Sequence, residues 1–239
     1  MIGYNPTIIT DGLVLCLDAA NPRSYTSGST TWSDLSGNGN NATLVNGPAF
    51  NTGSLGSIQF DAVNDSVIAS MPPNFSYENG ITISVWHYNG GSIAYRGLIN
   101  NGGYPDDRLG GFDLRYGREN YFGGSNNGTF LFLYITNLYG QYNYSLLARL
   151  YANANEWHQY VGTYDNNTIK MYKDGDLFTS ETHPAGGQIK NLTNYITIGS
   201  SGGREYLDGK LSQTFIYNRA LTPDEIKQNF NATRGRFGI

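Results

Sequence analysis

The 239-residue sequence has one cysteine, three histidines and few charged residues, and these shortages exclude several classes of protein. With Cys16 alone, no disulfide can form within the chain, and neither paired cysteines nor a His-x-x-x-His spacing supports a zinc site. Charged residues make up 14% and the net charge is −4, so no broad positive face is available for nucleic acid. No apolar run approaches a membrane span, and the opening MIGYNPTIITDG lacks the parts of a signal peptide. We therefore expect a chain made in the cytosol that binds neither nucleic acid nor membrane.

Glycine, asparagine and tyrosine are abundant instead, with 31 glycines and 19 tyrosines. This composition favours short strands separated by turns and predicts an all-β fold in one domain over residues 1–239. Apolar and β-branched runs predict strands that pack as two antiparallel sheets, at residues 13–17, 57–60, 81–87, 112–116, 130–135, 157–164, 169–173, 177–182, 195–198 and 211–217. Within 81–87, alternation places Ile81, Ile83 and Val85 in the core and Trp86 on the opposite face.

Turn and helix signals complete the pattern. Asp165-Asn166-Asn167 and Asp174-Gly175 predict hairpin turns that join three consecutive strands. Thr222-Pro-Asp-Glu225 has the residues of a capping box with proline at the first helical position. It predicts one short helix that ends at about Asn229 or Phe230 and packs across the sandwich, leaving 231–239 as a tail.

Four stretches, taken in order, resemble the laminin G-like branch of the concanavalin A-like sandwiches. They are GLVLCLD at 12–18, IQFDAVNDSV at 58–67, WHQYVGTYD with KDG at 157–175, and IG, LDGKL and IYNRALTPDEI at 198–226. The resemblance implies a jelly roll of two curved antiparallel sheets, used in most members as a binding or adhesion module, and it implies no single ligand.

The segment 24–44 and the chain end 229–238 are similar to free-standing single-domain proteins of tailed bacteriophages, especially marine and cyanobacterial ones. This resemblance implies a virion component made in the host cytoplasm: a capsid decoration, neck, tail or fibre protein present in multiple copies or as a homo-oligomer, with other virion proteins as partners. The alternative is a carbohydrate-binding adhesion module of a bacterial surface protein.

Catalysis finds little support in the residues. Retaining glycosidases need two carboxylates about 5–5.5 Å apart, and the sandwich family provides them as Glu-x-Asp-x-Glu on one strand face. That triplet is absent from this sequence, and the adjacent Asp106 and Asp107 would point to opposite faces of a strand. No Gly-x-Ser-x-Gly nucleophile elbow is present either. We expect a protein that is not an enzyme.

The loop WSDLSGNGNNATL at 32–44 resembles a metal site, because oxygen-bearing side chains occupy every second position from Asp34 to Asn40. The spacing imitates the start of an EF-hand, but Val45 stands where a bidentate glutamate is required. A structural turn is therefore the favoured prediction, with no cofactor. Calcium held by Asp34, Asp61 and Asp65 is kept as a hypothesis.

Glycan binding is the stronger functional candidate, because sugar sites combine exposed aromatic rings with amides and arginine. The tyrosine-rich segment supplies such groups at Tyr104, Arg108, Tyr116, Arg118, Tyr121, Asn126, Tyr139 and Tyr142. The same residues would also suit contacts with another protein, such as a second subunit, in place of cell-surface polysaccharide. In the tail, Arg234, Arg236 and Phe237 could form a docking segment or remain a flexible end.

Overall fold

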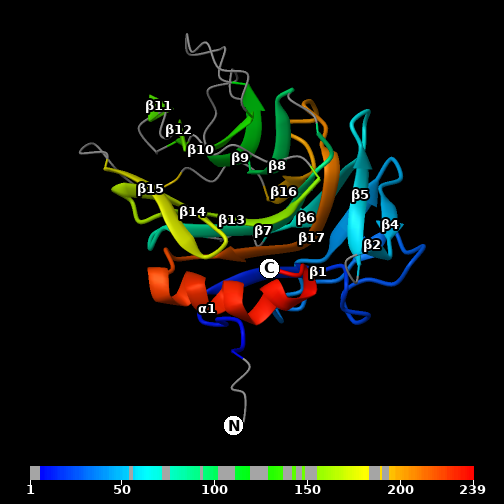
Figure 1. Cartoon of the computed structure of the whole chain (residues 1–239), viewed down its shortest axis with the longest axis horizontal. Coiled ribbons are helices and arrows are strands. Elements are labelled where there is room, and N and C mark those ends of the chain that lie inside the picture. The colour runs from blue at the N-terminus through cyan, green and yellow to red at the C-terminus, as the bar shows by residue number, and fades with distance from the viewer. Residues whose placement is uncertain are drawn as a thin grey trace.

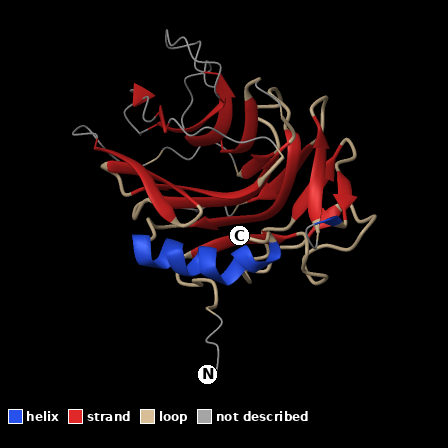
Figure 2. Cartoon of the chain, in the orientation of Figure 1, coloured by secondary structure: helices blue, strands red, loops and turns tan. Residues whose placement is uncertain are grey.

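The fold is taken from a computed structural model, which describes residues 6–53, 56–71, 76–91, 94–101, 111–118, 129–136, 142–143, 147–148, 155–182, 189 and 194–239. Two antiparallel sheets form a sandwich, and one helix follows the last strand (Figures 1 and 2). The predicted all-β sandwich of two antiparallel sheets with a short C-terminal helix is confirmed.

The first sheet has the order β15-β14-β13-β7-β17-β5-β4, and β1 also pairs with β17. In chain order its strands are β1 (Leu13–Asp18), β4 (Ala49–Asn51), β5 (Ser57–Asp61), β7 (Ile81–Asn89), β13 (Trp157–Tyr164), β14 (Thr168–Lys173), β15 (Asp176–Thr182) and β17 (Asp208–Tyr217).

The second sheet has the order β11-β10-β9-β8-β16-β6-β3-β2, and β12 pairs with β10. Its strands are β2 (Thr31–Trp32), β3 (Ala42–Val45), β6 (Ser66–Ser70), β8 (Arg96–Asn101), β9 (Gly111–Arg118), β10 (Thr129–Thr136), β11 (Tyr142–Asn143), β12 (Leu147–Ala148) and β16 (Tyr195–Ile198). Every predicted strand appears, while β2, β3, β4, β6, β8, β11 and β12 were not predicted.

The main core lies between the two sheets. Ile81, Ile83 and Val85 of β7 belong to it and are completely buried, as the alternation predicts. The opposite face of β7 is buried as well: Trp86 is 0% exposed. An alternating strand of an antiparallel sheet often has one solvated face, so something must cover this side of the first sheet.

That cover is the helix α1 (Pro223–Thr233), which lies across the outer face of the first sheet (Figure 2). Thr222 and Glu225 form the predicted capping box, with each side chain accepting from the other residue's backbone N–H. Ile226 packs into a second, smaller apolar cluster with Val161, Phe215 and other side chains of the outer face. The sandwich therefore has a third layer on one side.

The chain continues in ordered structure beyond the predicted end of the helix. α1 runs to Thr233 rather than to Asn229 or Phe230, and Arg234–Arg236 form a 3-10 turn, η4. Capping groups predict where a helix begins better than where it ends, because tertiary contacts here hold the last turn. In the part of the chain that the structure describes, no helix is long and apolar enough to cross a membrane.

Candidate binding site

The predicted glycan or partner contacts lie mostly outside the described residues. Arg118 and Tyr142 are described through their backbone alone, in β9 and β11. The others outside the described ranges are Tyr104, Arg108, Tyr121, Asn126 and Tyr139. Their roles stay predictions.

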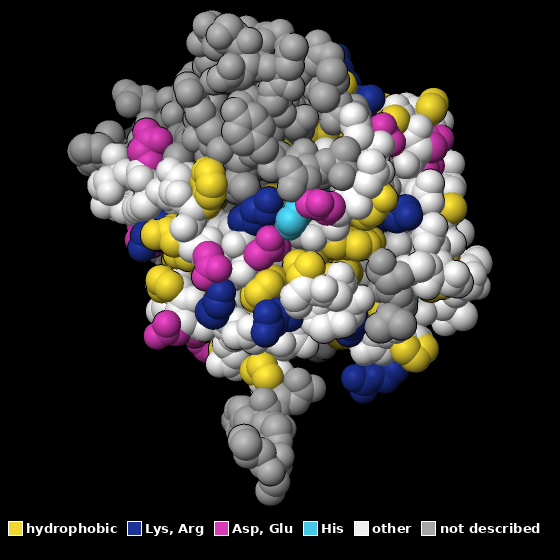
Figure 3. Space-filling model, in the orientation of Figure 1, with side chains coloured by type: hydrophobic (Ala, Val, Ile, Leu, Met, Phe, Trp, Pro, Cys, Tyr) yellow, Lys and Arg dark blue, Asp and Glu magenta, His cyan; other side chains and the backbone are white. Residues whose placement is uncertain are grey.

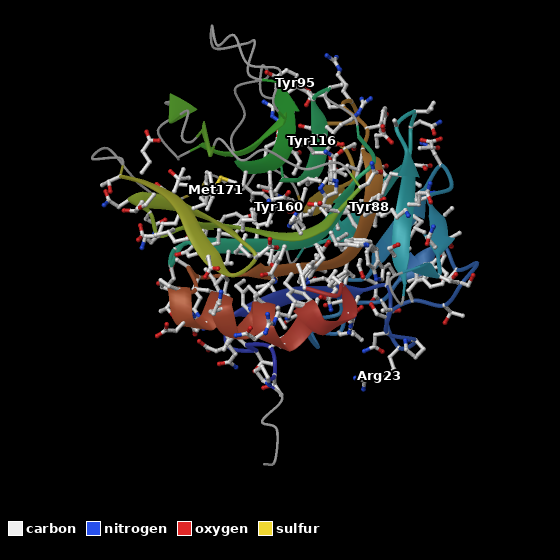
Figure 4. All side chains as sticks on the ribbon, viewed as in Figure 1. Arg23, Tyr88, Tyr95, Tyr116, Tyr160 and Met171 are labelled. Carbon is white, nitrogen blue, oxygen red and sulfur yellow. The ribbon has the colours of Figure 1, made fainter. Side chains whose placement is uncertain are left out.

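Tyr116 is fully described, and its ring does not lie at the surface. It is 0% exposed on the inward face of β9, which it shares with Leu114. Its hydroxyl donates to the carbonyl oxygen of Asp208 at 3.1 Å, and its ring centroid is 5.2 Å from that of His87. Figure 4 places Tyr116 and Tyr160 between the two sheets. The expectation that Tyr116 offers an exposed ring to a glycan or partner is corrected.

Two carboxylates enclose the imidazole of His158. Asp174 Oδ2 is 2.8 Å from Nδ1, and Glu156 Oε2 is 3.2 Å from Nε2. Both ring nitrogens are thus engaged, and Asp174 also accepts from the backbone N–H of Gln159 at 3.0 Å. This arrangement holds the start of β13 against the turn after β14.

The outer face of the first sheet carries a row of half-exposed side chains where α1 does not reach. Trp157 of β13 pairs with Tyr88 of β7, Tyr88 with Lys210 of β17, and Lys210 with Gln59 of β5. We call these four residues the open row. Trp157, Tyr88 and Lys210 are partly buried and Gln59 is exposed. Four strands about 4.8 Å apart make the row roughly 14 Å long.

The rings of the open row are fixed by their neighbours. The centroids of Trp157 and Tyr88 are 5.6 Å apart, and the Tyr88 hydroxyl donates to Asn155 Oδ1 at 3.3 Å. The ammonium of Lys210 lies 4.7 Å from the centre of the Tyr88 ring, within the range of a cation–π contact. Two aromatic rings are therefore held side by side on adjacent strands, with the Asn155 amide at the Tyr88 hydroxyl and the Lys210 ammonium over the Tyr88 ring.

A second row lies beside the first. It is two residues away on β13 and β7, and three residues away on β17, where the register shifts between Leu211 and Gln213. Gln159 pairs with Trp86, Trp86 with Gln213, and Gln213 with Asp18 of β1. We call these four residues the covered row, because all of them are buried. The Gln213 amide donates to Asp18 Oδ2 at 2.9 Å. Because side chains two apart share a strand face, both rows belong to one continuous surface.

The segment after α1 lies on this covered row. Phe237 stacks on Trp86 and also packs against Trp157, with centroids 5.0 Å apart. The guanidinium of Arg236 binds both oxygens of Asp18, at 2.6 and 2.7 Å. Arg234, by contrast, is exposed and lies over the ring of Phe230. Arg236 and Phe237 are thus bound to their own sheet rather than part of a flexible tail, and a docking role stays a prediction.

A family model described as the concanavalin A-like lectin/glucanases superfamily matches residues 61–227, well over half of the sequence. The chain belongs to this superfamily. Its strands β6 to β17 and the first turn of α1 fall within the match, whereas the covering residues Arg236 and Phe237 fall outside it. A comparison with curated proteins finds no significant match.

Solved structures share the fold of this superfamily member. The binding domain of Paraclostridial Mosquitocidal Protein 1 superposes with a TM-score of 0.67 at 23% identity, over 93% of this chain and 52% of that one. The receptor binding domain of botulinum neurotoxin C/D mosaic serotype gives 0.68 at 18%, over 93% and 51%. The botulinum neurotoxin serotype D ligand binding domain, in complex with N-acetylneuraminic acid, gives 0.67 at 16%, over 93% and 51%. This lectin-like domain thus spans about half the length of each.

The loop at 32–44 of this lectin-like domain is a structural turn, as predicted. Asp34 Oδ1 accepts from the backbone N–H groups of Cys16 and Ser36, both at 2.9 Å. Asp34 Oδ2 accepts from the Ser36 hydroxyl at 2.7 Å and from the Asn40 N–H at 3.0 Å. Asn38 and Asn40 donate to the carbonyl oxygen of Val14 in β1. The side chains fasten the loop to the first sheet.

Asp61 and Asp65, the other aspartates of the calcium hypothesis, also accept hydrogen bonds from backbone N–H groups. Asp61 Oδ1 accepts from Val63 N–H at 2.8 Å, and Asp65 Oδ2 accepts from Asp61 N–H at 3.1 Å. The backbone bonds lower the pKa of Asp61. Among the described residues, no three His, Cys, Asp or Glu side chains gather in a group that could hold a metal ion.

Sequence reasoning passed over both rows of this lectin-like domain. The signal was present: Trp86 lies in the predicted strand 81–87 and Tyr88 follows it directly on the same face, and Trp157 and Gln159 share a face of the predicted strand 157–164. Aromatic and amide side chains on the face away from the core indicate a surface with a ligand or a covering element. What the sequence did not provide was the pairing of β7 with β13 and β17, which brings the two strands side by side.

Proposed function

We propose that this protein is a non-enzymatic carbohydrate-binding module and that the open row is its sugar-binding surface. The observation that carries the proposal is the pair formed by Trp157 and Tyr88, whose partly exposed rings lie 5.6 Å apart on adjacent strands. The superfamily assignment and the resemblance to toxin receptor-binding domains support a binding function of this kind.

The chemistry of the row suits a sugar. Pyranose rings have an apolar face that packs on an aromatic ring and hydroxyl groups that need hydrogen-bonding partners at its edge. Trp157 and Tyr88 provide aromatic surface, and Asn155, Lys210 and Gln59 provide polar groups beside it, the Lys210 ammonium lying over the Tyr88 ring. Because strands hold the rings, little conformational entropy is lost on binding.

Charge around the row favours a neutral sugar over an acidic one. Glu156 precedes Trp157 and is exposed, and Asp208 lies two residues before Lys210 on the same strand. The two carboxylates repel an anionic sugar, and this repulsion opposes its attraction to the single ammonium of Lys210. The surface in Figure 3 carries acidic, basic and hydrophobic side chains together rather than a field of one sign.

The residues of the site also favour binding without catalysis. Hydrolysis of a glycosidic bond requires two carboxyl groups that flank the bond and carry free lone pairs. Near the open row, the Asp174 carboxylate and one oxygen of Glu156 are engaged by His158. Asp18 is engaged by Arg236.

As the biological setting, we propose a virion: a capsid decoration, neck, tail or fibre component present in several copies, with other virion proteins as partners. This proposal rests on the sequence resemblance of segments 24–44 and 229–238, and the alternative is an adhesion module of a bacterial surface protein. An electron-microscopy map of intact particles tests the setting. Density for this sandwich on the particle supports it, and recovery of the protein solely from bacterial envelopes contradicts it.

The sugar-binding proposal is tested by glycan-array screening followed by calorimetry with the best ligand. We expect Trp157→Ala and Tyr88→Ala each to weaken binding by about tenfold, since each removes one stacking face. Phe178→Ala is the matched control, because Phe178 is 48% exposed on the edge strand β15, away from the row. Equal affinity in Trp157→Ala and wild type contradicts the proposal.

A further inference from the structure

The covered row continues the open row on the same sheet face. Trp157 of the open row and Gln159 of the covered row are two residues apart on β13, and Tyr88 and Trp86 are two apart on β7. Beyond the covered row the face becomes apolar, with Val161, Phe215 and the residues packed under Ile226. The covered row is therefore the boundary between the exposed surface and the part buried by α1.

The covered row has the chemical composition of a saccharide subsite rather than that of a helix-packing surface. It contains one indole, two amides and one carboxylate, from Trp86, Gln159, Gln213 and Asp18. Three amide atoms of this row have no hydrogen-bond partner among the described residues. They are the Nε2 and Oε1 of Gln159 and the Oε1 of Gln213. Buried amides without partners are destabilising, so their presence at one place indicates a role other than packing.

The part of the cover that follows α1 is small. It consists of the Phe237 ring on Trp86 and the Arg236 ion pair with Asp18, in which the arginine side chain is 30% exposed. Phe230 of α1 also stacks on Trp86, with centroids 5.8 Å apart, and this contact does not depend on residues 234–239. A β-carbon added at Gly235 or Gly238 would meet no atom within 4 Å, so the backbone on either side of the two contacts stands clear of its neighbours. No β-sheet pairing holds residues 234–239.

α1 keeps its own anchors if the cover leaves. Thr233 accepts from the Trp86 indole N–H at 3.0 Å, and Lys227 binds Asp176 at 2.6 Å. Asp18 also retains donors, because the Gln213 amide and the Ala20 N–H still reach its oxygens at 2.9 and 3.0 Å. Release of residues 234–239 therefore neither unfolds the helix nor leaves a carboxylate without hydrogen bonds.

We propose that residues 234–239 are a releasable cover over a second sugar subsite, and that a longer oligosaccharide displaces Phe237 and Arg236 to bind the covered row. This rests on the proposed function, since the ligand reaches the covered row from the open row. A sugar ring then replaces the phenyl ring on Trp86, and sugar hydroxyls replace the guanidinium on Asp18 and reach the unpartnered amides. Short sugars occupy the open row alone.

Calorimetry with a matched series of short and long oligosaccharides tests the cover. In Arg236→Gln we expect affinity for the long ligand to rise at least threefold while affinity for the short ligand stays unchanged, because the cost of displacing the cover falls. Phe237→Ala should raise the long-ligand affinity as well, but Phe237 also packs on Trp157 of the open row, so Arg236→Gln alone serves for the short-ligand comparison. Arg234→Gln is the control, since Arg234 does not touch the covered row, and it should match wild type.

A second variant separates a subsite from a structural clasp. Adding Gln159→Leu to Arg236→Gln should abolish the gain for the long ligand, because it removes amide groups that have no protein partner to lose. A folded Arg236→Gln protein with unchanged or weaker long-ligand affinity overturns the cover. Wild-type affinity in Trp157→Ala instead contradicts the proposed sugar site on the open row. The failure of the cover and the failure of the proposed function therefore give different results.

Discussion

Phe237 stacks on Trp86 with ring centroids 3.9 Å apart and ring planes 15° apart. This contact ties the residues after α1 to the middle of the first sheet. Phe237→Ala removes a stacked aromatic pair and part of a buried ring, and we expect the free energy of unfolding to fall by about 1–3 kcal/mol. Urea unfolding measures the loss. The emission of Trp86 should shift to longer wavelength in the folded variant, and an unshifted spectrum with wild-type stability would contradict the contact.

Gln159 should cost the protein stability. Its side-chain amide is 0% exposed and has no hydrogen-bond partner among the described residues. Gln159→Leu keeps a similar volume and removes the unsatisfied groups, so we expect the free energy of unfolding to rise by about 1–2 kcal/mol. Gln228→Leu is the comparison, because the Gln228 amide donates to the Thr7 carbonyl oxygen at 2.8 Å. A loss of stability in Gln159→Leu would show that its amide is satisfied.

His87 should make the fold sensitive to mild acid. Burial lowers the pKa of His87 to about 3, and the charge of His158 lowers it as well. An unfolded histidine titrates near 6.5, so as pH falls from 7.5 to 5 the unfolded chain binds a proton that the folded chain excludes. The free energy of unfolding therefore falls over this window, and His87→Phe should flatten the fall. Urea midpoints at several pH values test this, and an unchanged slope counts against it.

The buried carboxyl of Asp113 has the opposite effect on the pH dependence of stability. Burial raises its pKa to about 6, although Arg115 beside it partly offsets the rise. Between pH 7 and about 4, the folded protein therefore binds a proton at this carboxyl more readily than the unfolded chain does. This proton uptake raises the free energy of unfolding as pH falls. Asp113→Asn should remove this gain and steepen the acid loss. A flatter pH profile in Asp113→Asn would contradict the assignment.

Asp34 should contribute more than its position in an exposed loop suggests. Its carboxylate accepts four hydrogen bonds, from Cys16 N–H, Ser36 N–H, the Ser36 hydroxyl and Asn40 N–H. Asp34→Ala leaves the three backbone N–H donors unpaired, while the Ser36 hydroxyl can still donate to the Val14 carbonyl oxygen, and we expect a loss of about 2–4 kcal/mol in the free energy of unfolding.

Asn38→Ala is the control for Asp34, because the Asn38 amide donates to the Leu13 carbonyl oxygen at 3.0 Å from an exposed position. It should cost less than about 1 kcal/mol. Equal losses in the two variants would contradict the role given to Asp34. Since both Asp34 oxygens are used by the protein, chelation of calcium should also leave the melting temperature unchanged.

Local patterns predicted the elements whose causes are local. The capping box of Thr222 and Glu225 is present because its residues are three apart. The Asp174-Gly175 turn forms because both residues take positive φ, 53° and 79°, as a primed hairpin turn requires. Alternation in 81–87 assigned the core face of β7 correctly because the period of a strand is fixed.

What the sequence could not provide depends on pairing between distant strands. The covered row joins β1, β7, β13 and β17, and no local rule places Asp18 beside Gln213, 195 residues later. The same limit explains Tyr116, whose ring was expected at the surface: its burial depends on β9 facing β7 across the sandwich. Residues 234–237 looked like a tail because η4 is too short to show a period, and contacts with Asp18 and Trp86 order it.

The affinity of Trp157→Ala for the best array glycan tests the account most directly, because the pair of Trp157 and Tyr88 carries the proposed function. Calorimetry should show binding about tenfold weaker than wild type. Phe178→Ala should bind like wild type, and all three proteins should share the same circular dichroism. Unchanged affinity in folded Trp157→Ala would contradict a sugar site on the open row.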